Sequence, residues 1–333
     1  AVYNHTGREF FAFADILENG EKSKYRDWYF IDGFPLKSEW GEIPNFKCFG
    51  YYGGMPKLNL KNPEVEKYIT DVACYWIKEC DIDGWRLDVG DEISHFFWKN
   101  FRKAVKAVKK DMLIIGEIWH YAGDFLEGDE WDTVMNYPFY LNLIDLLADE
   151  KITVSQFVQN LGYLKGRLNK NCYPLMWNLI DSHDTARFLH LCNDNKKKQH
   201  LAAAFQLLLP GMPMIYYGDE YAMPGANDPD CRRGMYWDEE YQDKEMYEWY
   251  KRLIQVRKSH ACIVEGELAG SVTEDEEGTV VLIRKNGEET IAMIFNCSSS
   301  AKKFNEYTQK YNLLTENTFD GNVEGFDAAV IVL

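Results

Sequence analysis

The chain lacks long apolar runs, a surplus of basic residues and closely spaced cysteine pairs. Spanning a bilayer takes roughly 20 consecutive apolar residues, and no run in these 333 residues approaches that length. Lys and Arg number 37 against 53 Asp and Glu, for a formal net charge of −16, whereas nucleic-acid binding requires a basic surface. We therefore expect neither a membrane nor a nucleic acid as a partner.

The cysteines and histidines also argue against a metal site. No two of the eight cysteines form a CxxC pair, so the sequence predicts no zinc site. His5, His120 and His183 are not linked by an HExxH or comparable spacing, so no metal ligand is expected among them. Scattered cysteines in a chain of this length are typical of reduced, mostly buried thiols. The sequence thus predicts a cytoplasmic protein.

What the chain does contain is an alternation of helical and strand-like segments. Helices are predicted over 64–80, 92–109, 140–149, 153–168, 197–209 and 243–259, and strands over 84–89, 112–118, 131–135, 175–181 and 213–217. This alternation is typical of a parallel sheet or a (β/α) barrel. We assign residues 1–260 to a barrel domain that carries an irregular insertion, rich in glycine, proline and aromatic residues, at about 6–57.

The first residues bear on how complete this barrel is. Residues 1–7 have the pattern of a strand end running into a loop, and five full strands plus this tail fall short of eight. An open barrel would expose sheet edges. We therefore expect the barrel to be incomplete at its N-terminus in this chain. The missing portion is expected in a second chain, in a swapped partner or in an upstream segment.

Residues 261–333 have a different pattern. Apolar runs over 279–284 and 290–295 flank Asn286-Gly287, which is a strong hairpin signal. A further apolar run covers 328–333. We expect a small C-terminal domain of the antiparallel β-sandwich type.

Three short segments that contain carboxylates carry the chemistry. Each closes an apolar, strand-like run, where a barrel strand meets its loop; they are 83–89 (DGWRLDV), 116–120 (GEIWH) and 180–185 (IDSHDT). Three acids at one end of a barrel suit the cleavage of glycosidic bonds. That reaction requires a proton donor and a carboxylate that attacks or shields an oxocarbenium-like centre.

Each segment alone also has a simpler interpretation. Arg86 and Asp88 share a strand face, so Arg86 either keeps Asp88 ionised, as a nucleophile requires, or merely forms a buried ion pair. Glu117, between an apolar run and Trp119, is either a general acid held in its acid form by apolar walls or an ordinary strand-end residue. Asp184 is either a site residue or a helix N-cap. It is not part of a serine triad, because contiguous Ser-His-Asp residues cannot take that geometry.

Together, the segments resemble the sequence motifs of the α-amylase superfamily, glycoside hydrolase family 13. Residues 2–5 are similar to the end of its first motif, 83–89 to the second, 116–119 to the third and 182–184 to the fourth. Further strings resemble its neopullulanase, cyclomaltodextrinase and maltogenic amylase subgroup; they are 55–59 (MPKLN), 134–139 (VMNYPF), 211–220 (GMPMIYYGDE) and 228–233 (DPDCRR). The resemblance covers essentially the whole chain. It implies a (β/α)8 TIM barrel with its insertion after the third strand.

The resemblance implies a role for each site residue. Asp88 is expected to be the nucleophile, Glu117 the general acid/base, and Asp184 the residue that binds and distorts the sugar at the cleavage point. The implied substrate-binding residues are Arg86, which holds Asp88, together with His5, His183, Trp119, Tyr137, Phe49, Asp228 and Arg232. A retaining mechanism is also implied, in which the two catalytic carboxyls lie about 5–5.5 Å apart.

The implied function is the hydrolysis of α-1,4 glucosidic bonds in cyclodextrins, pullulan or maltooligosaccharides by double displacement. Whether α-1,6 bonds are also cleaved is left undecided. The alternatives are a transglycosylase or isomerase of the same superfamily, a non-catalytic carbohydrate-binding relative, and a metal-dependent barrel enzyme. Asp88, Glu117 and Asp184 are all present, which favours an enzyme over a binding relative.

Cofactors and assembly follow from the same resemblance. No cofactor is expected, although calcium stays open because Asn4 lies where relatives have a calcium ligand. The N-terminal β domain through which this subgroup dimerises does not fall within these residues. A homodimer is therefore expected of the full-length protein only.

Overall fold

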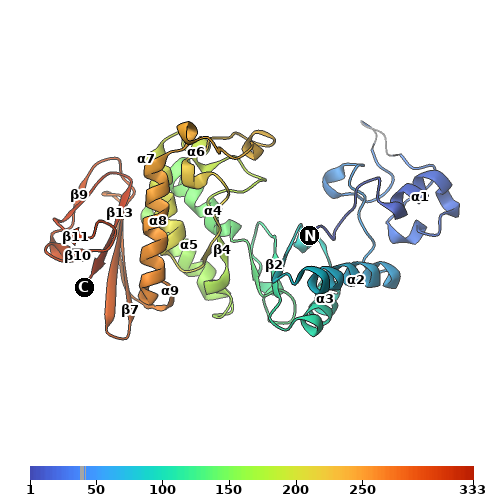
Figure 1. The fold of residues 1–333 in the computed structure, drawn as a ribbon, viewed down its shortest axis with the longest axis horizontal. Helices are drawn as coiled ribbons and strands as arrows, with labels where there is room; N and C mark the ends of the chain where they lie inside the picture. The colour runs from blue at the N-terminus through green and yellow to red at the C-terminus, as the bar shows by residue number, and fades with distance from the viewer. Residues whose placement is uncertain (38–40, 42) are drawn as a thin grey trace. The chain divides into compact units, whose positions relative to one another are not determined.

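The structure is a computed structural model that describes residues 1–37, 41 and 43–333. Its contacts divide the chain into two compact units, Ala1–Met135 and Asn136–Leu333. Figure 1 shows the helices and strands of both units, and each unit is described by itself.

A parallel three-stranded sheet organises the first unit. Its strands are β1 (Gly84–Leu87), β2 (Leu113–Gly116) and β3 (Thr133–Val134), in the order β1-β2-β3. Helix α2 (Pro63–Cys80) precedes β1, and helix α3 (His95–Val108) connects β1 to β2. The Asn62 side chain accepts a hydrogen bond from the Glu64 amide at the start of α2, where Pro63 takes the first turn. Both helices and all three strands lie where the sequence predicts them.

The predicted irregular insertion is held together by aromatic packing. Phe13 lies with its ring centroid 5.0 Å from that of Tyr29 and 5.2 Å from that of Phe46, and all three side chains are buried. Phe13 belongs to a nine-residue helix, α1 (Phe11–Asn19), that the sequence analysis did not predict. Residues 38–40 and 42 of the predicted insertion lie outside the described residues.

Two short parallel strands and six helices form the α/β part of the second unit, within the residues described. Strands β4 (Trp177–Asn178) and β5 (Met212–Pro213) pair directly. The helices are α4 (Tyr137–Leu143), α5 (Val154–Arg167), α6 (Phe188–Leu191), α7 (Lys196–Leu208), α8 (Lys244–Ser259) and α9 (Ala261–Glu265). The predicted helix at 140–149 is α4 followed by a π-helical turn, Ile144–Ala148. Each of these strands is two residues long, which is shorter than the predicted strands at 175–181 and 213–217. The remaining residues of the two apolar runs lie outside the strands.

The C-terminal part is an antiparallel sheet, as predicted. Its strands run in the order β11-β10-β13-β8-β7-β6. They are β6 (Glu267–Glu274), β7 (Thr279–Asn286), β8 (Glu289–Asn296), β10 (Tyr311–Asn312), β11 (Asn317–Thr318) and β13 (Asp327–Val332), while β9 (Lys302–Lys303) pairs with β12 (Asn322–Val323). The hairpin between β7 and β8 turns at Gly287, whose φ of 61° suits glycine. The predicted turn signal is confirmed.

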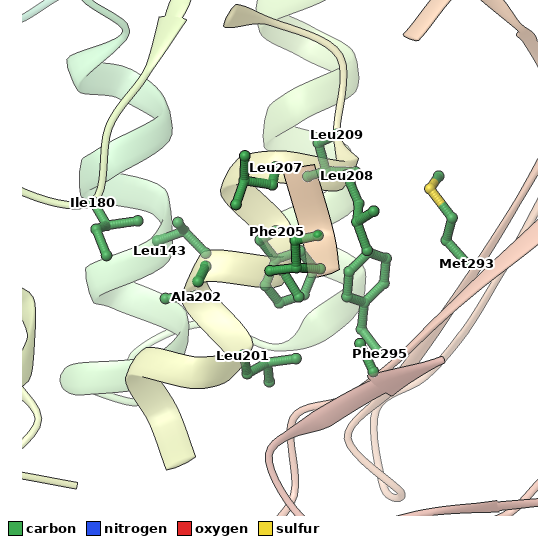
Figure 2. Packing of buried hydrophobic residues seen from close by; sticks show 14 of the residues in the cluster. Leu143, Ile180, Leu201, Ala202, Phe205, Leu207, Leu208, Leu209, Met293 and Phe295 are labelled. Atoms are coloured by element: carbon green, nitrogen blue, oxygen red, sulfur yellow. The ribbon is translucent and has the colours of Figure 1, made fainter. Parts of the chain in front are cut away.

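The central strands of this sheet, β7, β8 and β13, bury side chains on both faces. On one face, Val280, Met293 and Phe295 join a large apolar core with α4, α5, α7, α8 and α9. Phe205 of α7 stacks on Phe295 of β8, with ring centroids 4.2 Å apart, and Figure 2 shows both rings within this cluster. On the other face, Ala292 and Ile294 pack among residues from 304 to 331. Helices and sheet of the second unit therefore share one core, and the domain boundary predicted at residue 260 stays a prediction.

Within the part of the chain that the structure describes, no helix is both long and apolar enough to cross a membrane.

The shared core predicts cooperative unfolding of the second unit. Phe205→Ala removes a fully buried ring and is expected to lower the free energy of unfolding by about 3–5 kcal/mol. Urea denaturation followed by circular dichroism and by tryptophan fluorescence measures the loss. Leu268→Ala, on an exposed position of β6, is the control, with an expected change below about 0.5 kcal/mol. Separate transitions for the helices and the sheet would contradict a shared core.

Candidate active site

The register between β1 and β2 places two carboxylates side by side. Leu87 pairs with Gly116 at the ends of these parallel strands, so the next residues, Asp88 and Glu117, emerge together. The Glu117 amide donates to the Leu87 carbonyl at 2.9 Å, which extends the pairing one residue beyond the strands. The predicted position of both acids at strand ends is confirmed.

Arg86 lies between these two carboxylates. Its Nη1 donates to Asp88 Oδ1 at 2.6 Å, and its Nη2 lies 2.9 Å from Glu117 Oε1. The sequence predicted the first contact from the two-residue spacing of a strand. The second contact depends on strand register. One guanidinium therefore bridges the two carboxylates and reduces the repulsion between them.

Glu117 is buried and has polar partners at both carboxylate oxygens. Its side chain is 6% exposed. The Val89 amide donates to Oε2 at 3.0 Å, and Trp119 Nε1 donates to Oε1 at 3.4 Å. Donors at both oxygens suit the ionised carboxylate, which is the form that a general base requires. The Trp119 ring is 40% exposed and offers an apolar face beside this carboxylate.

Val89 has a left-handed backbone conformation, with φ 46° and ψ 44°. This region is unfavourable for a β-branched residue and costs of order 1–3 kcal/mol. Val89 directly follows Asp88 in the chain. Its conformation directs the Val89 amide towards Glu117. The backbone at this turn is therefore strained in a way that orients Glu117.

His5 and Phe49 lie together in the same unit. Their rings stack with centroids 5.2 Å apart and an interplanar angle of 10°. Burial lowers the pKa of His5, while the nearby carboxylates of Asp88 and Glu92 act to raise it. His5 is therefore neutral at pH 7 and has both a donor and an acceptor nitrogen. Phe49 lines a cavity of about 610 Å³ together with Phe46, Tyr51, Lys57 and Glu92.

The second unit holds the third carboxylate, Asp184, after β4. Arg232 Nη2 donates to Asp184 Oδ1 at 3.0 Å, and His183 Nε2 lies 3.0 Å from Asp184 Oδ2. Arg232 Nε also donates to the His183 carbonyl at 2.8 Å and lies 2.8 Å from Asp228 Oδ1. Asp184 is not a helix N-cap, because α6 begins at Phe188 with Arg187 as its N-cap. The predicted site residues His183, Asp184, Asp228 and Arg232 thus lie together.

Tyr137 contacts this group through Ser182. The Tyr137 hydroxyl lies 3.1 Å from Ser182 Oγ, and Ser182 Oγ accepts a hydrogen bond from the Asp184 amide at 3.2 Å. Tyr137 is fully buried. Its side chain therefore supports the Asp184 loop through Ser182, and the subsite-lining role implied by the resemblance stays a prediction.

The structure thus brings the predicted site residues together in two groups. The first unit holds His5, Phe49, Arg86, Asp88, Glu117 and Trp119, and the second holds Tyr137, His183, Asp184, Asp228 and Arg232. The catalytic and substrate-binding roles of these residues stay predictions.

Sequence reasoning missed several residues at these groups. Lys57 Nζ lies 2.8 Å from Glu92 Oε2, which also accepts from Asn4 Nδ2 at 3.0 Å. In the second unit, Asp181 and Asp219 are buried with Arg187. The sequence signal available for the two aspartates was their position at the end of an apolar, strand-like run. These runs are residues 179–181 and 215–219.

Residues 1–242 match the family described as "Alpha amylase, catalytic domain". The chain therefore belongs to the α-amylase family, glycoside hydrolase family 13, as the motifs predicted. The family's (β/α) barrel and the C-terminal β domain predicted from the sequence are confirmed with it.

Individual relatives carry names from the predicted subgroup. A cyclomaltodextrinase from Geobacillus thermopakistaniensis (strain MAS1) is 46% identical over 301 residues, which cover 90% of this chain and 51% of that protein. The intracellular maltogenic amylase of Bacillus subtilis is 41% identical over 297 residues, covering 89% of this chain and 50% of that protein. A solved cyclomaltodextrinase matches with a TM-score of 0.93 at 36% identity, covering 99% of this chain and 59% of that one. The chain spans about half the length of the curated relatives it matches.

The residues around Asn4 do not fit the calcium site that the family resemblance left open. Calcium takes six to eight oxygen ligands. Asn4 Oδ1 is buried without a hydrogen-bond donor, but the adjacent carboxylate, Glu92, already binds the Lys57 ammonium and the Asn4 amide. Among the described residues, no group of three or more His, Cys, Asp or Glu side chains is arranged to hold a metal ion.

This arrangement predicts that stability does not depend on calcium. Excess EDTA is expected to leave the melting temperature of the protein unchanged, because Lys57 supplies the positive charge beside Glu92. Differential scanning calorimetry measures this. Lys57→Met is the comparison variant, and its melting temperature is expected to fall because Glu92 loses its counter-charge. A fall in the wild-type melting temperature with EDTA, reversed by added calcium, would contradict the prediction.

Proposed function

We propose that the protein to which this chain belongs is a retaining α-glucan hydrolase. It cleaves α-1,4 glucosidic bonds in cyclodextrins, pullulan or maltooligosaccharides, and its action on α-1,6 bonds is a second specificity to be tested. The observation that carries the proposal is Arg86 bridging Asp88 and Glu117 at the ends of paired strands. Bridging by one guanidinium requires two close carboxylates, which suits the short separation of retaining enzymes.

In the first step, Asp88 acts as the nucleophile. Its ionised carboxylate, held by Arg86, attacks the anomeric carbon as the glycosidic bond to the leaving oxygen breaks. Glu117 in its acid form donates a proton to that oxygen, and the leaving sugar departs with a free hydroxyl. The product of this step is a covalent glycosyl ester on Asp88.

In the second step, Glu117 acts as the general base. Its carboxylate takes a proton from water, and the resulting hydroxide equivalent attacks the anomeric carbon and releases Asp88. The donors around Glu117 support the ionised form needed here, with the Arg86 guanidinium 2.9 Å away. Two inversions retain the anomeric configuration.

The remaining residues are proposed to bind the sugar. Asp184 and neutral His5 offer acceptors and donors to hydroxyl groups, as the family role predicts. Trp119 and Phe49 offer apolar ring faces that suit the faces of a glucose ring. Arg232 holds Asp184 and the His183 carbonyl in place, and it shares Asp228 as a second partner.

The names of the relatives support this choice over the alternatives. Proteins named cyclomaltodextrinase and maltogenic amylase match about nine-tenths of the chain. A transglycosylase would follow the same first step and replace water by a sugar hydroxyl, so the ratio of transfer to hydrolysis separates the two.

We also propose a cytoplasmic location. All eight cysteines are free thiols, as a reducing compartment requires, and the Bacillus subtilis relative is named as intracellular. The predicted homodimer of the full-length protein, and the predicted lack of nucleic-acid and membrane partners, stay predictions.

Substitution of the two first-unit carboxylates tests the proposal. In the full-length protein, Glu117→Gln is expected to lower kcat for γ-cyclodextrin by at least ~10²-fold, because the amide cannot transfer a proton. Asp88→Asn is expected to lower it at least as far, because the amide is a poor nucleophile. Release of reducing sugar from γ-cyclodextrin, pullulan and starch measures both, and the ranking of substrates measures specificity.

Asp83→Asn is the matched control for these variants. Asp83 lies at the opposite end of β1 with a side chain that is 97% exposed. Its substitution is expected to leave activity unchanged. Wild-type rates in Glu117→Gln, or no sugar release from any glucan by the folded wild-type protein, would overturn the proposed function.

A further inference from the structure

A cluster of three ionisable residues is buried beneath the Asp184 loop in the second unit. Asp181, Arg187 and Asp219 are each 1% exposed. Asp181 follows β4, Arg187 is the N-cap of α6, and Asp219 opens a short helical turn after β5. The proposed mechanism uses none of these three side chains, yet two of them flank His183 and Asp184 in the chain.

Each carboxyl of the cluster has one oxygen with a donor and one without. Asp181 Oδ2 accepts from the Phe188 amide at 2.7 Å, and Asp219 Oδ1 accepts from Arg187 Nη1 at 3.0 Å. Asp181 Oδ1 and Asp219 Oδ2 are buried with no donor. The two carboxyl groups are nevertheless in direct side-chain contact with each other.

The charges of the cluster do not balance if both acids are ionised. Two buried carboxylates against one guanidinium leave one negative charge without compensation, and burying an unpaired charge is very costly. A single proton between the two carboxyls removes this charge and supplies the missing donor. The same proton then satisfies both of the oxygens that lack a partner.

We propose that Asp181 and Asp219 share one proton in a carboxyl–carboxylate hydrogen bond, and that this neutral cluster with Arg187 positions the loop that carries Asp184. The positioning role rests on the proposed function, whereas the shared proton rests on the burial and contacts of the cluster alone.

The surroundings of the cluster agree with a retained proton. Burial raises the pKa of both acids, and for Asp219 the neighbouring Asp181 raises it further. Tyr250 of α8 faces the pair with its pKa raised well above the ordinary value, so it is neutral. Tyr140 faces Asp181 from the α4 side with a pKa raised to about 12. Glu220 adds negative charge nearby, while Arg187 supplies the cation.

Arg187 connects the cluster to both loops of the second-unit group. Its amide donates to the Gly225 carbonyl at 2.9 Å, and its Nη1 donates to the Tyr217 carbonyl at 2.6 Å. The guanidinium also lies 4.2 Å from the ring centroid of Tyr216. Arg187 therefore ties the segment after Asp184 to residues 217–225, which lead into Asp228 and Arg232. Displacing it would shift Asp184 relative to Arg232.

The shared proton gives stability a defined pH dependence. The folded pair keeps a proton that the unfolded chain releases near pH 4. Stability from this proton is therefore full below about pH 4 and is lost as pH rises through the raised pKa of the folded pair. Within that window, the folding equilibrium constant changes up to about tenfold per pH unit for one proton.

Asp219→Asn tests the proton directly. The amide supplies a permanent hydrogen to Asp181 Oδ1 while its own oxygen still accepts from Arg187, so folding is preserved. Urea denaturation at a series of pH values is expected to show a pH slope in the variant that is smaller by one proton than in the wild type. Asp181→Asn is expected to give the same result, because either acid can carry the proton. Asp194→Asn, at an exposed carboxylate whose left-handed φ of 59° asparagine tolerates, is the control. Equal slopes in the wild type and both cluster variants would overturn the shared proton.

Arg187→Met and Arg187→Lys test the positioning role. With rates normalised to the folded fraction, Arg187→Met is expected to raise KM for γ-cyclodextrin at least tenfold, because Asp184 and Arg232 lose their relative placement. Arg187→Lys, which keeps the charge without the planar fork, is expected to recover part of the loss. If Arg187→Met does not fold, Arg187→Lys alone is compared with the wild type, and an unchanged KM would overturn the positioning role.

The denaturation experiment does not require enzymatic activity. A wild-type protein inactive on every glucan would therefore refute the proposed function, while the shared proton could still be measured.

Discussion

The site depends on the pairing of Leu87 with Gly116 at the ends of two parallel strands. Glycine is needed at this pair because a Cβ on Gly116 would lie 2.3 Å from the Trp131 ring, and one on Gly90 would lie 2.7 Å from it. Trp131 is itself stacked on Phe125, with centroids 4.1 Å apart, and cannot give way easily. A slip of one residue would direct one of the two carboxylates to the opposite face of the sheet. Tight packing behind the strands therefore preserves the contact of Arg86 with both Asp88 and Glu117.

Charge balance by arginine recurs in each group of functional residues. Arg86 lies between Asp88 and Glu117, and Arg232 lies between Asp184 and Asp228. Arg187 pairs with Asp219. The planar guanidinium suits this use because it offers donors in several directions and stays charged. Asp88, Asp184 and Asp228 are partly exposed, so solvent offsets the charge imbalance in those two groups. The fully buried cluster lacks this contact with solvent, which is why it alone calls for a shared proton.

The sequence predicted those features that are encoded locally. Helix α2 follows from its Asn62 cap and first-turn proline, and the β7–β8 hairpin follows from Asn286-Gly287. The contact of Arg86 with Asp88 follows from the period of a strand. The contact of Arg86 with Glu117 was not predictable, because it depends on the register of strands 31 residues apart, between positions 86 and 117. The contacts around Asp219 have the same origin, and α1 was missed because aromatic packing within the insertion stabilises a segment with no extended helical period.

The central claim is that Asp88 becomes covalently attached to the sugar. In a maltosyl fluoride with a second fluorine at C2 of the reacting sugar, the C2 fluorine slows both steps of a double displacement. The fluoride leaving group keeps the first step fast, so the intermediate accumulates. Mass spectrometry of the digested full-length protein after this treatment measures the site of attachment. The account predicts one fluoromaltosyl adduct, on the peptide containing Asp88, and its loss in Asp88→Asn. Stoichiometric inactivation with the adduct on another residue, or inversion of the anomeric configuration in the product, would contradict it.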